Sequence, residues 1–185
     1  MDAQEKYTDL IQQGEELCDE AMTASQRGDY DQAIEMYNRA EDLFLNVRDQ
    51  NWLNFLRHEK LRVLQSLDQA KDALELTDLI IEGYQETLNH NGLALTLIHK
   101  ADLFIATEEP YKAISSLNLA KALINSKKLN DLKGYLHSSF AVAYNAVDDL
   151  ALAIAALNKA LVYYSPESYP NEYSWCLLQV GICYQ

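Results

Sequence analysis

The 185-residue sequence contains little glycine, proline or cysteine: six Gly, three Pro and three Cys. With so few breaking residues, and with Ala, Leu, Glu and Lys plentiful, the composition favours helix throughout the chain. Cys18, Cys176 and Cys183 form no CxxC pair and are odd in number. They therefore indicate free thiols in a reducing compartment rather than a disulfide framework.

The sequence also lacks long apolar runs and an excess of positive charge. No stretch approaches the ~20 apolar residues that span a bilayer, and the polar N-terminus is unlike a secretory signal. The formal net charge of −13 excludes the general electrostatic route to nucleic acid or anionic membrane. Residues 1–93 hold 20 acidic and 8 basic side chains, which are interpreted as solvated outer faces or, alternatively, as a surface for a basic partner. We predict a cytoplasmic protein that binds neither nucleic acid nor membrane.

A pattern of small and apolar residues returns every 40 positions. Its three most regular columns are Ala33, Ala73, Ala113 and Ala153; Ala40, Ile80, Ala120 and Ala160; and Phe44, Tyr84, Ile124 and Tyr164. A constant period of this length is typical of stacked repeats. Small residues seven positions apart on one helix face allow neighbouring helices to approach closely.

Apolar spacing and breakers predict helices over 4–26, 29–47, 52–66, 68–88, 93–106, from about 108, over 129–147 and 148–164, and from about 171. Successive helices pair into hairpins, each with a tight internal turn and a longer turn to the next hairpin. Neither helix can bury its apolar stripe alone, so stacking makes the core continuous.

The repeats closely resemble the tetratricopeptide repeat (TPR). The fourth repeat shows this best, with Phe140, Ala141, Tyr144, Ala153, Leu157 and Ala160, whereas the second departs from the pattern with Ile80 in place of the usual alanine. The 40-residue length is similar to the repeats of kinesin light chains, LGN/Pins adaptors and Rap-type receptors. The resemblance implies an all-α, right-handed superhelical α-solenoid of stacked helical hairpins with about nine helices. Compared with the usual repeat of about 34 residues, the extra residues are expected in the connection between hairpins.

We predict a single solenoid domain over residues 1–185. Its repeats span about 14–47, 54–87, 94–127 and 134–167, with a partial repeat over 174–185. The last helix has the pattern of a first helix without a partner, so we expect a part of a longer protein, with an imperfect capping helix as the alternative. The bare apolar face of that helix predicts self-association.

Motifs for chemistry are missing from the sequence. The four histidines lie on different predicted elements without HExxH spacing, and there is no GxSxG, Walker-type or GxGxxG motif. His58 and His99 could reach one surface, but no Cys or carboxylate column would complete a metal site with them. We predict no enzyme activity, no cofactor and no metal.

The resemblance implies that the first helix of each hairpin lines a concave groove. Reading positions on that face at 40-residue steps predicts a peptide- or partner-binding set: Phe55, His58, Arg62, Leu95, Ile98, Asp102, Tyr135, Ser138, Val142, Asn145, Trp175 and Leu178. The column of Phe55, Leu95, Tyr135 and Trp175 forms either an apolar strip for a ligand or padding between neighbouring helices. Positions matching the carboxylate clamp of Hsp70- and Hsp90-binding co-chaperones lack the required cations, being Cys18, Met22, Glu59, Leu95 and His99.

These features favour a non-catalytic protein–protein interaction scaffold that binds a peptide or partner helix. The alternative is a sensory or regulatory module of a bacterial signalling protein, similar to the Rap-type peptide receptors. A third hypothesis, a substrate-recruiting part of an enzyme, would need catalytic motifs beyond Gln185.

Overall fold

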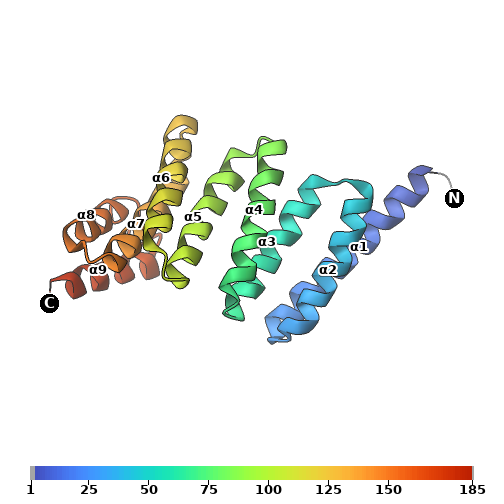
Figure 1. Cartoon of the computed structure of the whole chain (residues 1–185), viewed down its shortest axis with the longest axis horizontal. Coiled ribbons are helices and arrows are strands. Elements are labelled where there is room, and N and C mark those ends of the chain that lie inside the picture. The colour runs from blue at the N-terminus through green and yellow to red at the C-terminus, as the bar shows by residue number, and fades with distance from the viewer. Residues whose placement is uncertain (1–2, 185) are drawn as a thin grey trace. The chain divides into compact units, whose positions relative to one another are not determined.

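The computed structural model describes residues 3–184, and these are helical almost throughout, as Figure 1 shows. The first helices are α1 (Ala3–Arg27), α2 (Tyr30–Val47), α3 (Gln50–Ser66) and α4 (Ala70–Glu86). They are followed by α5 (His90–Ala106), α6 (Pro110–Lys127), the short 3-10 helix η1 (Asn130–Leu132), α7 (Lys133–Ala146), α8 (Leu150–Ala160) and α9 (Pro170–Cys183). The predicted all-α array of helical hairpins, with nine α-helices among these residues, is confirmed.

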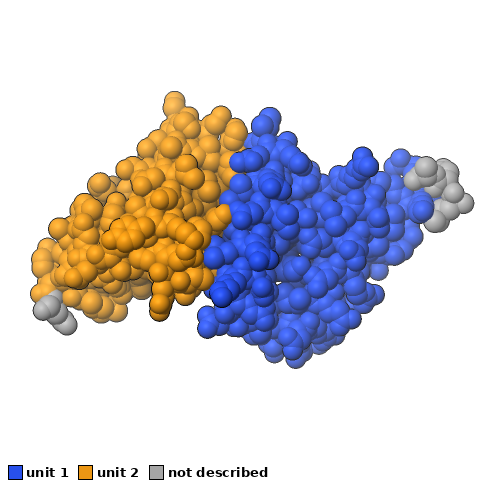
Figure 2. Space-filling model, viewed as in Figure 1, with its two compact units in different colours: residues 1–88 blue, residues 89–185 orange. Residues whose placement is uncertain are grey.

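The chain divides into two compact units, residues 1–88 and 89–185, which Figure 2 colours separately. In the first unit α1 packs on α2 and α3 on α4. Ala21, Ala33 and Ala40 have no exposed surface, which is why small residues are needed where these helices meet. Phe44 fills the space beside them and stacks in parallel on Trp52 of α3, with ring centroids 5.2 Å apart.

In the second unit α5 packs on α6, α7 on α8, and α9 on α8. Its core repeats the same design, with Ala113, Ala120 and Ala160 completely buried beside larger apolar side chains. The first helices of two hairpins, α5 and α7, also contact each other directly. The helices α5 and α7 therefore lie side by side, whereas α9 packs on α8.

A left-handed backbone residue ends almost every helix at a constant spacing. Residues 28, 48, 68, 88, 108, 128 and 148 all have positive φ, between 53° and 84°. Only the first of them is glycine, and the others accept a conformation that favours glycine. In six of these turns the next residue donates its N–H to the carbonyl five residues earlier, for example Asp49 to Phe44 at 3.1 Å and Asp149 to Tyr144 at 2.9 Å. This is the Schellman closure of a helix C-terminus.

The expected difference between tight and long turns is wrong for most of the chain. Connections within and between hairpins are two or three residues long, apart from residues 128–132, which contain η1, and the left-handed residues recur every 20 positions. The extra residues of the 40-residue repeat therefore lengthen the helices rather than the connection between hairpins.

The exception is the connection over residues 161–169. The apolar spacing predicts that the helix before it continues to residue 164, but α8 ends at Ala160 and turns follow. After Ala160 the bonding becomes mixed, since Val162 N–H donates to the Lys159 carbonyl at 3.2 Å and Tyr163 N–H to the Ala160 carbonyl at 2.9 Å. Pro166 then keeps a regular helix from resuming, because the residue before proline avoids the helical conformation and proline has no N–H to donate. The chain then starts α9 at Pro170, where a first-turn proline is tolerated.

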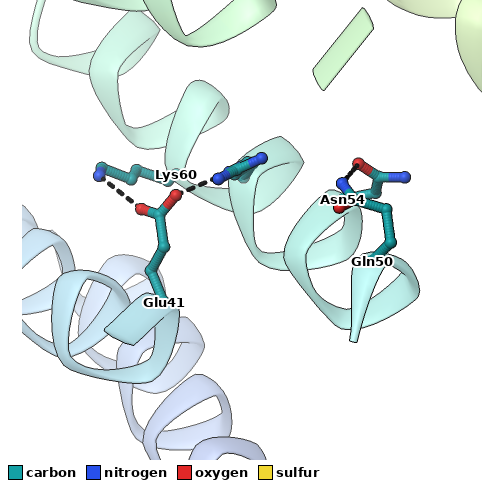
Figure 3. A network of polar contacts seen from close by, with 5 residues as sticks. Glu41, Gln50, Asn54 and Lys60 are labelled. Carbon is teal, nitrogen blue, oxygen red and sulfur yellow. Dashed lines mark hydrogen bonds and ion pairs between the residues drawn. The ribbon is translucent and has the colours of Figure 1, made fainter. Parts of the chain in front are cut away.

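A polar network joins α2 to α3 in the first unit, as Figure 3 shows. The carboxylate of Glu41 accepts a hydrogen bond from Arg57 Nε at 2.7 Å and pairs with Lys60 Nζ at 3.3 Å. The Arg57 side chain is only 10% exposed, so the pair with Glu41 compensates the burial of its charge. On the same helix Gln50 donates to the Asn54 amide oxygen at 3.1 Å, and this amide pair lies over Gly83 of α4.

Candidate binding site beside the 161–169 connection

A cavity of about 980 Å³ lies in the second unit, where α7 and α9 flank the 161–169 connection. Its aromatic lining consists of Tyr135, Tyr163, Tyr164, Tyr169 and Trp175. Its polar lining consists of Asp102, Asn130, Asp131, Ser138, Ser139, Asn171 and Glu172. Leu132, Gly134 and Val142 complete the wall. The volume is near the upper end of the roughly 300–1,000 Å³ range of ligand sites.

A hydrogen-bonded pair at the base of the cavity joins α5 to α7. The Tyr135 hydroxyl donates to Asp102 Oδ2 at 2.6 Å, and Ser139 also hydrogen-bonds this carboxylate. Burial raises the pKa of Asp102 above its ordinary value, and the two hydrogen bonds oppose that rise. Burial, followed by the nearby charge of Asp102, raises the pKa of Tyr135 as well. At neutral pH Tyr135 is therefore a neutral donor held in one orientation by its bond to Asp102.

Tyr164 fits against a glycine of the cavity lining. A Cβ at Gly134 would lie 2.7 Å from Tyr164 Cε1, so any other residue here would require this ring to shift. The ring centroids of Tyr164 and Tyr169 are 5.5 Å apart, which is an ordinary distance for an aromatic pair. Burial raises the pKa of Tyr164, a hydrogen bond with Ser138 lowers it, and the charge of Glu172 adds a smaller rise. Tyr164 and Glu172 both belong to the lining.

Charge in the lining has one sign. Asp102, Asp131 and Glu172 contribute carboxylates, and no Lys, Arg or His is found among the described residues that line the cavity. Glu172 lies in the first turn of α9, where the free N–H groups of the helix favour a carboxylate. Aromatic rings and carboxylates together make a surface that is complementary to a cation with an apolar stem.

Five of the sequence-predicted site residues line this cavity: Asp102, Tyr135, Ser138, Val142 and Trp175. The remaining predicted residues of the second unit lie outside its lining. Leu95 is half-buried, Ile98 has no exposed surface, and Asn145 and Leu178 are exposed. Ile98 is therefore a core residue in this structure, whereas the others stay predictions.

The predicted residues of the first unit lie on α3. Phe55 is exposed and its ring meets Trp52 edge-on, with centroids 5.5 Å apart. The His58 ring is 5.4 Å from the Tyr84 ring. Arg62 pairs with Glu59 at 3.3 Å and borders a small hollow of about 170 Å³ with Met22 and Tyr30.

Sequence reasoning missed the lining that comes from the 161–169 connection and from the helix ends beside it. The pattern predicts Tyr163 and Tyr164 in a helix that continues to residue 164 and Tyr169 between that helix and the next, none of them as a site residue. A signal was available, because these tyrosines cluster around Pro166 and Pro170 in a chain with only three prolines.

Other chemistry finds little support in the structure. Within residues 3–184, no group of three His, Cys, Asp or Glu side chains is placed to hold a metal ion. Burial, followed by the charges of Asp19 and Glu15, raises the pKa of the Cys18 thiol to about 12, which leaves it unreactive at neutral pH. No described helix combines the length and the apolar character that crossing a membrane requires.

Comparison with known proteins gives matches in structure only. No family model matches the chain, and no curated sequence matches it significantly. Among solved structures, BtubC (BKLC) from P. vanneervenii aligns with a TM-score of 0.77 at 15% identity, over 100% of this chain and 84% of that one. The nearly identical TPR-like repeats of a putative kinesin light chain from Podosopora anserina align with a TM-score of 0.73 at 18% identity, over 92% and 85% of the two chains.

A variant of the same Podosopora anserina repeats aligns with a TM-score of 0.74 at 17% identity, over 92% of this chain and 84% of that one. The resemblance to kinesin light chain repeats that the sequence predicts is thus confirmed at the level of the fold. The chain is an α-solenoid of TPR-like helical hairpins.

Proposed function

We propose that the chain is a non-catalytic protein–protein interaction module, and that a peptide or partner helix docks in the cavity beside the 161–169 connection. The observation that carries the proposal is the cavity itself, about 980 Å³ in volume with five aromatic side chains in its lining. Large aromatic side chains in a concave surface are typical of binding hot spots. The lining also includes five residues of the face that was expected to bind a ligand: Asp102, Tyr135, Ser138, Val142 and Trp175.

Trp175 is the residue to test, because it is part of the lining and is 37% exposed, so its removal changes the surface more than the core. Leu152 of α8 is the matched control, since it is 45% exposed and does not line the cavity. Phe55 of α3 tests the separate contribution predicted for the first unit.

The experiment is affinity capture from lysate with the wild type and the variants Trp175→Ala, Phe55→Ala and Leu152→Ala as baits, with quantitative mass spectrometry of the captured proteins. We expect Trp175→Ala to lose partners that Leu152→Ala retains, by about tenfold for a typical hot-spot residue. Equal recovery by the Trp175 and Leu152 variants would exclude this cavity as the docking site. Circular dichroism verifies that each bait is folded.

A further inference from the structure

The cavity in the second unit concentrates negative charge that the rest of the unit balances. Residues 89–185 contain eight acidic side chains and seven lysines, hence a net charge of 7 − 8 = −1. Three of the eight carboxylates line the cavity, and none of the seven lysines does. The negative lining is therefore a local separation of charge and does not follow from a generally acidic unit.

Four lysines of this unit contact aromatic rings, and three of them do so on rings outside the cavity lining. Lys100 and Lys112 lie over Phe104, at 5.8 and 5.6 Å from the ring centroid, and Lys121 lies over Phe140 at 5.8 Å. Lys133 lies 5.9 Å from the centroid of Tyr163, a ring that also borders the cavity. Ammonium–ring contacts are thus common in this unit, while the cavity's acidic lining has no lysine of its own.

Two of the three carboxylates are available to a ligand. Asp102 is already held by the hydroxyl of Tyr135 and by Ser139. Asp131 and Glu172 are exposed, and among the described residues neither takes part in a salt bridge. Glu172 and Tyr164 both line the cavity. A cation in the cavity would therefore meet carboxylates and aromatic rings of the same lining.

We propose that the cavity selects a lysine or arginine side chain of the docking peptide. Trp175 and Tyr169 would contact its aliphatic stem, and Glu172 and Asp131 its charged head. This inference rests on the function proposed above and adds the chemistry of the partner. A peptide suits the site better than a small amine, because a volume of about 980 Å³ accommodates several residues around one side chain.

Capped amino acids test the selectivity directly. The probes are N-acetyl-L-arginine amide, N-acetyl-L-lysine amide, the uncharged N-acetyl-L-norleucine amide and the anionic N-acetyl-L-glutamate amide, titrated to about 20 mM because single side chains bind weakly. The readout is the indole N–H resonance of Trp175 in ¹H–¹⁵N spectra. Trp52 is the only other tryptophan and lies in the first unit, so its resonance is an internal control.

The expected result is a saturable shift of the Trp175 resonance with the arginine and lysine probes, a much weaker shift with norleucine and none with glutamate. Glu172→Gln should weaken binding of the arginine probe by about five- to tenfold, because the charge-assisted contact is lost while the ring contacts remain. Glu167→Gln removes another exposed carboxylate, in the 161–169 connection just before α9 but outside the lining, and should leave the affinity unchanged.

Three results would overturn the proposal: equal shifts with arginine and norleucine, a preference for the glutamate probe, or no Trp175 shift with either cationic probe. An effect of Glu167→Gln as large as that of Glu172→Gln would also do so, because it would indicate general electrostatics. In any of these cases, a Trp175-dependent capture of partners would still support docking in the cavity without cation selectivity. If Trp175→Ala instead captured the same partners as Leu152→Ala, docking in this cavity would be excluded, whatever the probe titrations gave.

Discussion

Three glycines on helices should respond differently to the same added methyl group. Gly14 of α1 and Gly134 of α7 occupy the same repeat position, 120 residues or three repeats apart, and each contacts a large ring. A Cβ at Gly14 would lie 2.6 Å from Phe44 Cζ, and one at Gly134 would lie 2.7 Å from Tyr164 Cε1. Gly181 of α9 has no neighbouring atom within 4 Å of such a Cβ, which makes it the control.

The magnitudes follow from two opposing effects. Replacing glycine by alanine inside a helix stabilises it by about 0.5–1 kcal/mol, and Gly181→Ala should gain this amount. Overpacking costs about 1–3 kcal/mol, and the structure decides where in that range each site lies. Phe44 is completely buried and stacked on Trp52, so Gly14→Ala should lose a net ~2 kcal/mol. The Tyr164 ring can move into the cavity, so Gly134→Ala should lose at most ~1 kcal/mol.

Hydrogen exchange measured by mass spectrometry is the suitable assay, because repeat arrays need not unfold in a single two-state step. Peptides from α1–α2, α7–α8 and α9 report the local free energy of opening for the three variants. Gly134→Ala should also reduce binding of the arginine probe, since the displaced Tyr164 ring narrows the cavity. If all three variants were stabilised equally, the two ring–glycine contacts would be wrong.

Further predictions concern a turn, a buried ion pair and the last helix. Lys128 has a φ of 57°, so Lys128→Gly should raise the free energy of unfolding by about 1 kcal/mol in a urea titration. Lys127 is the last residue of α6, and Lys127→Gly should lower the same free energy by about 1 kcal/mol. Glu41→Gln should lower the free energy of unfolding by about 3 kcal/mol, because it leaves the charge of Arg57 buried without a carboxylate partner. Glu59→Gln disrupts an exposed contact to Arg62 and should lower it by less than about 1 kcal/mol. Thermal melts that rank the two variants in the reverse order would contradict this. Leu178 is 62% exposed on α9, the helix whose apolar face predicts self-association. The wild type should therefore form a concentration-dependent dimer in sedimentation velocity, and Leu178→Asp should abolish it. A wild type that stays monomeric at high concentration would refute the prediction.

Much of the fold could be predicted from the sequence because the repeat makes its own signal four times. Alanines at 33, 113 and 153 mark buried contacts between helices, and all three have no exposed surface. Most helix bounds agree with the predicted ones to within a few residues. The equal length of the turns could not be predicted, because Gly28 is the one left-handed residue that is a glycine, the residue type that usually marks such a position.

The candidate site was only partly predictable for a different reason. The 40-residue step brings Tyr135 and Trp175 into one column, and both line the cavity. The 40-residue step groups Tyr164 with Phe44, Tyr84 and Ile124 as a packing position, so it does not indicate that this ring also lines a cavity. The contribution of the tyrosines in the 161–169 connection depends on where the chain turns after Ala160, which the local pattern of apolar residues does not encode.

The 20-residue spacing of left-handed turns has a consequence for how such a chain can change. The turns are closed by backbone hydrogen bonds, and the side chains at residues 48, 68, 108, 128 and 148 are exposed. These positions hold arginine, aspartate, glutamate, lysine and aspartate, so the charge differs from turn to turn while the closure stays the same. Each turn is thus a position where surface charge, or an attached label, can be altered independently of the packing. Recombining segments in steps of 40 residues would keep both the turns and the inward-facing side chains in register.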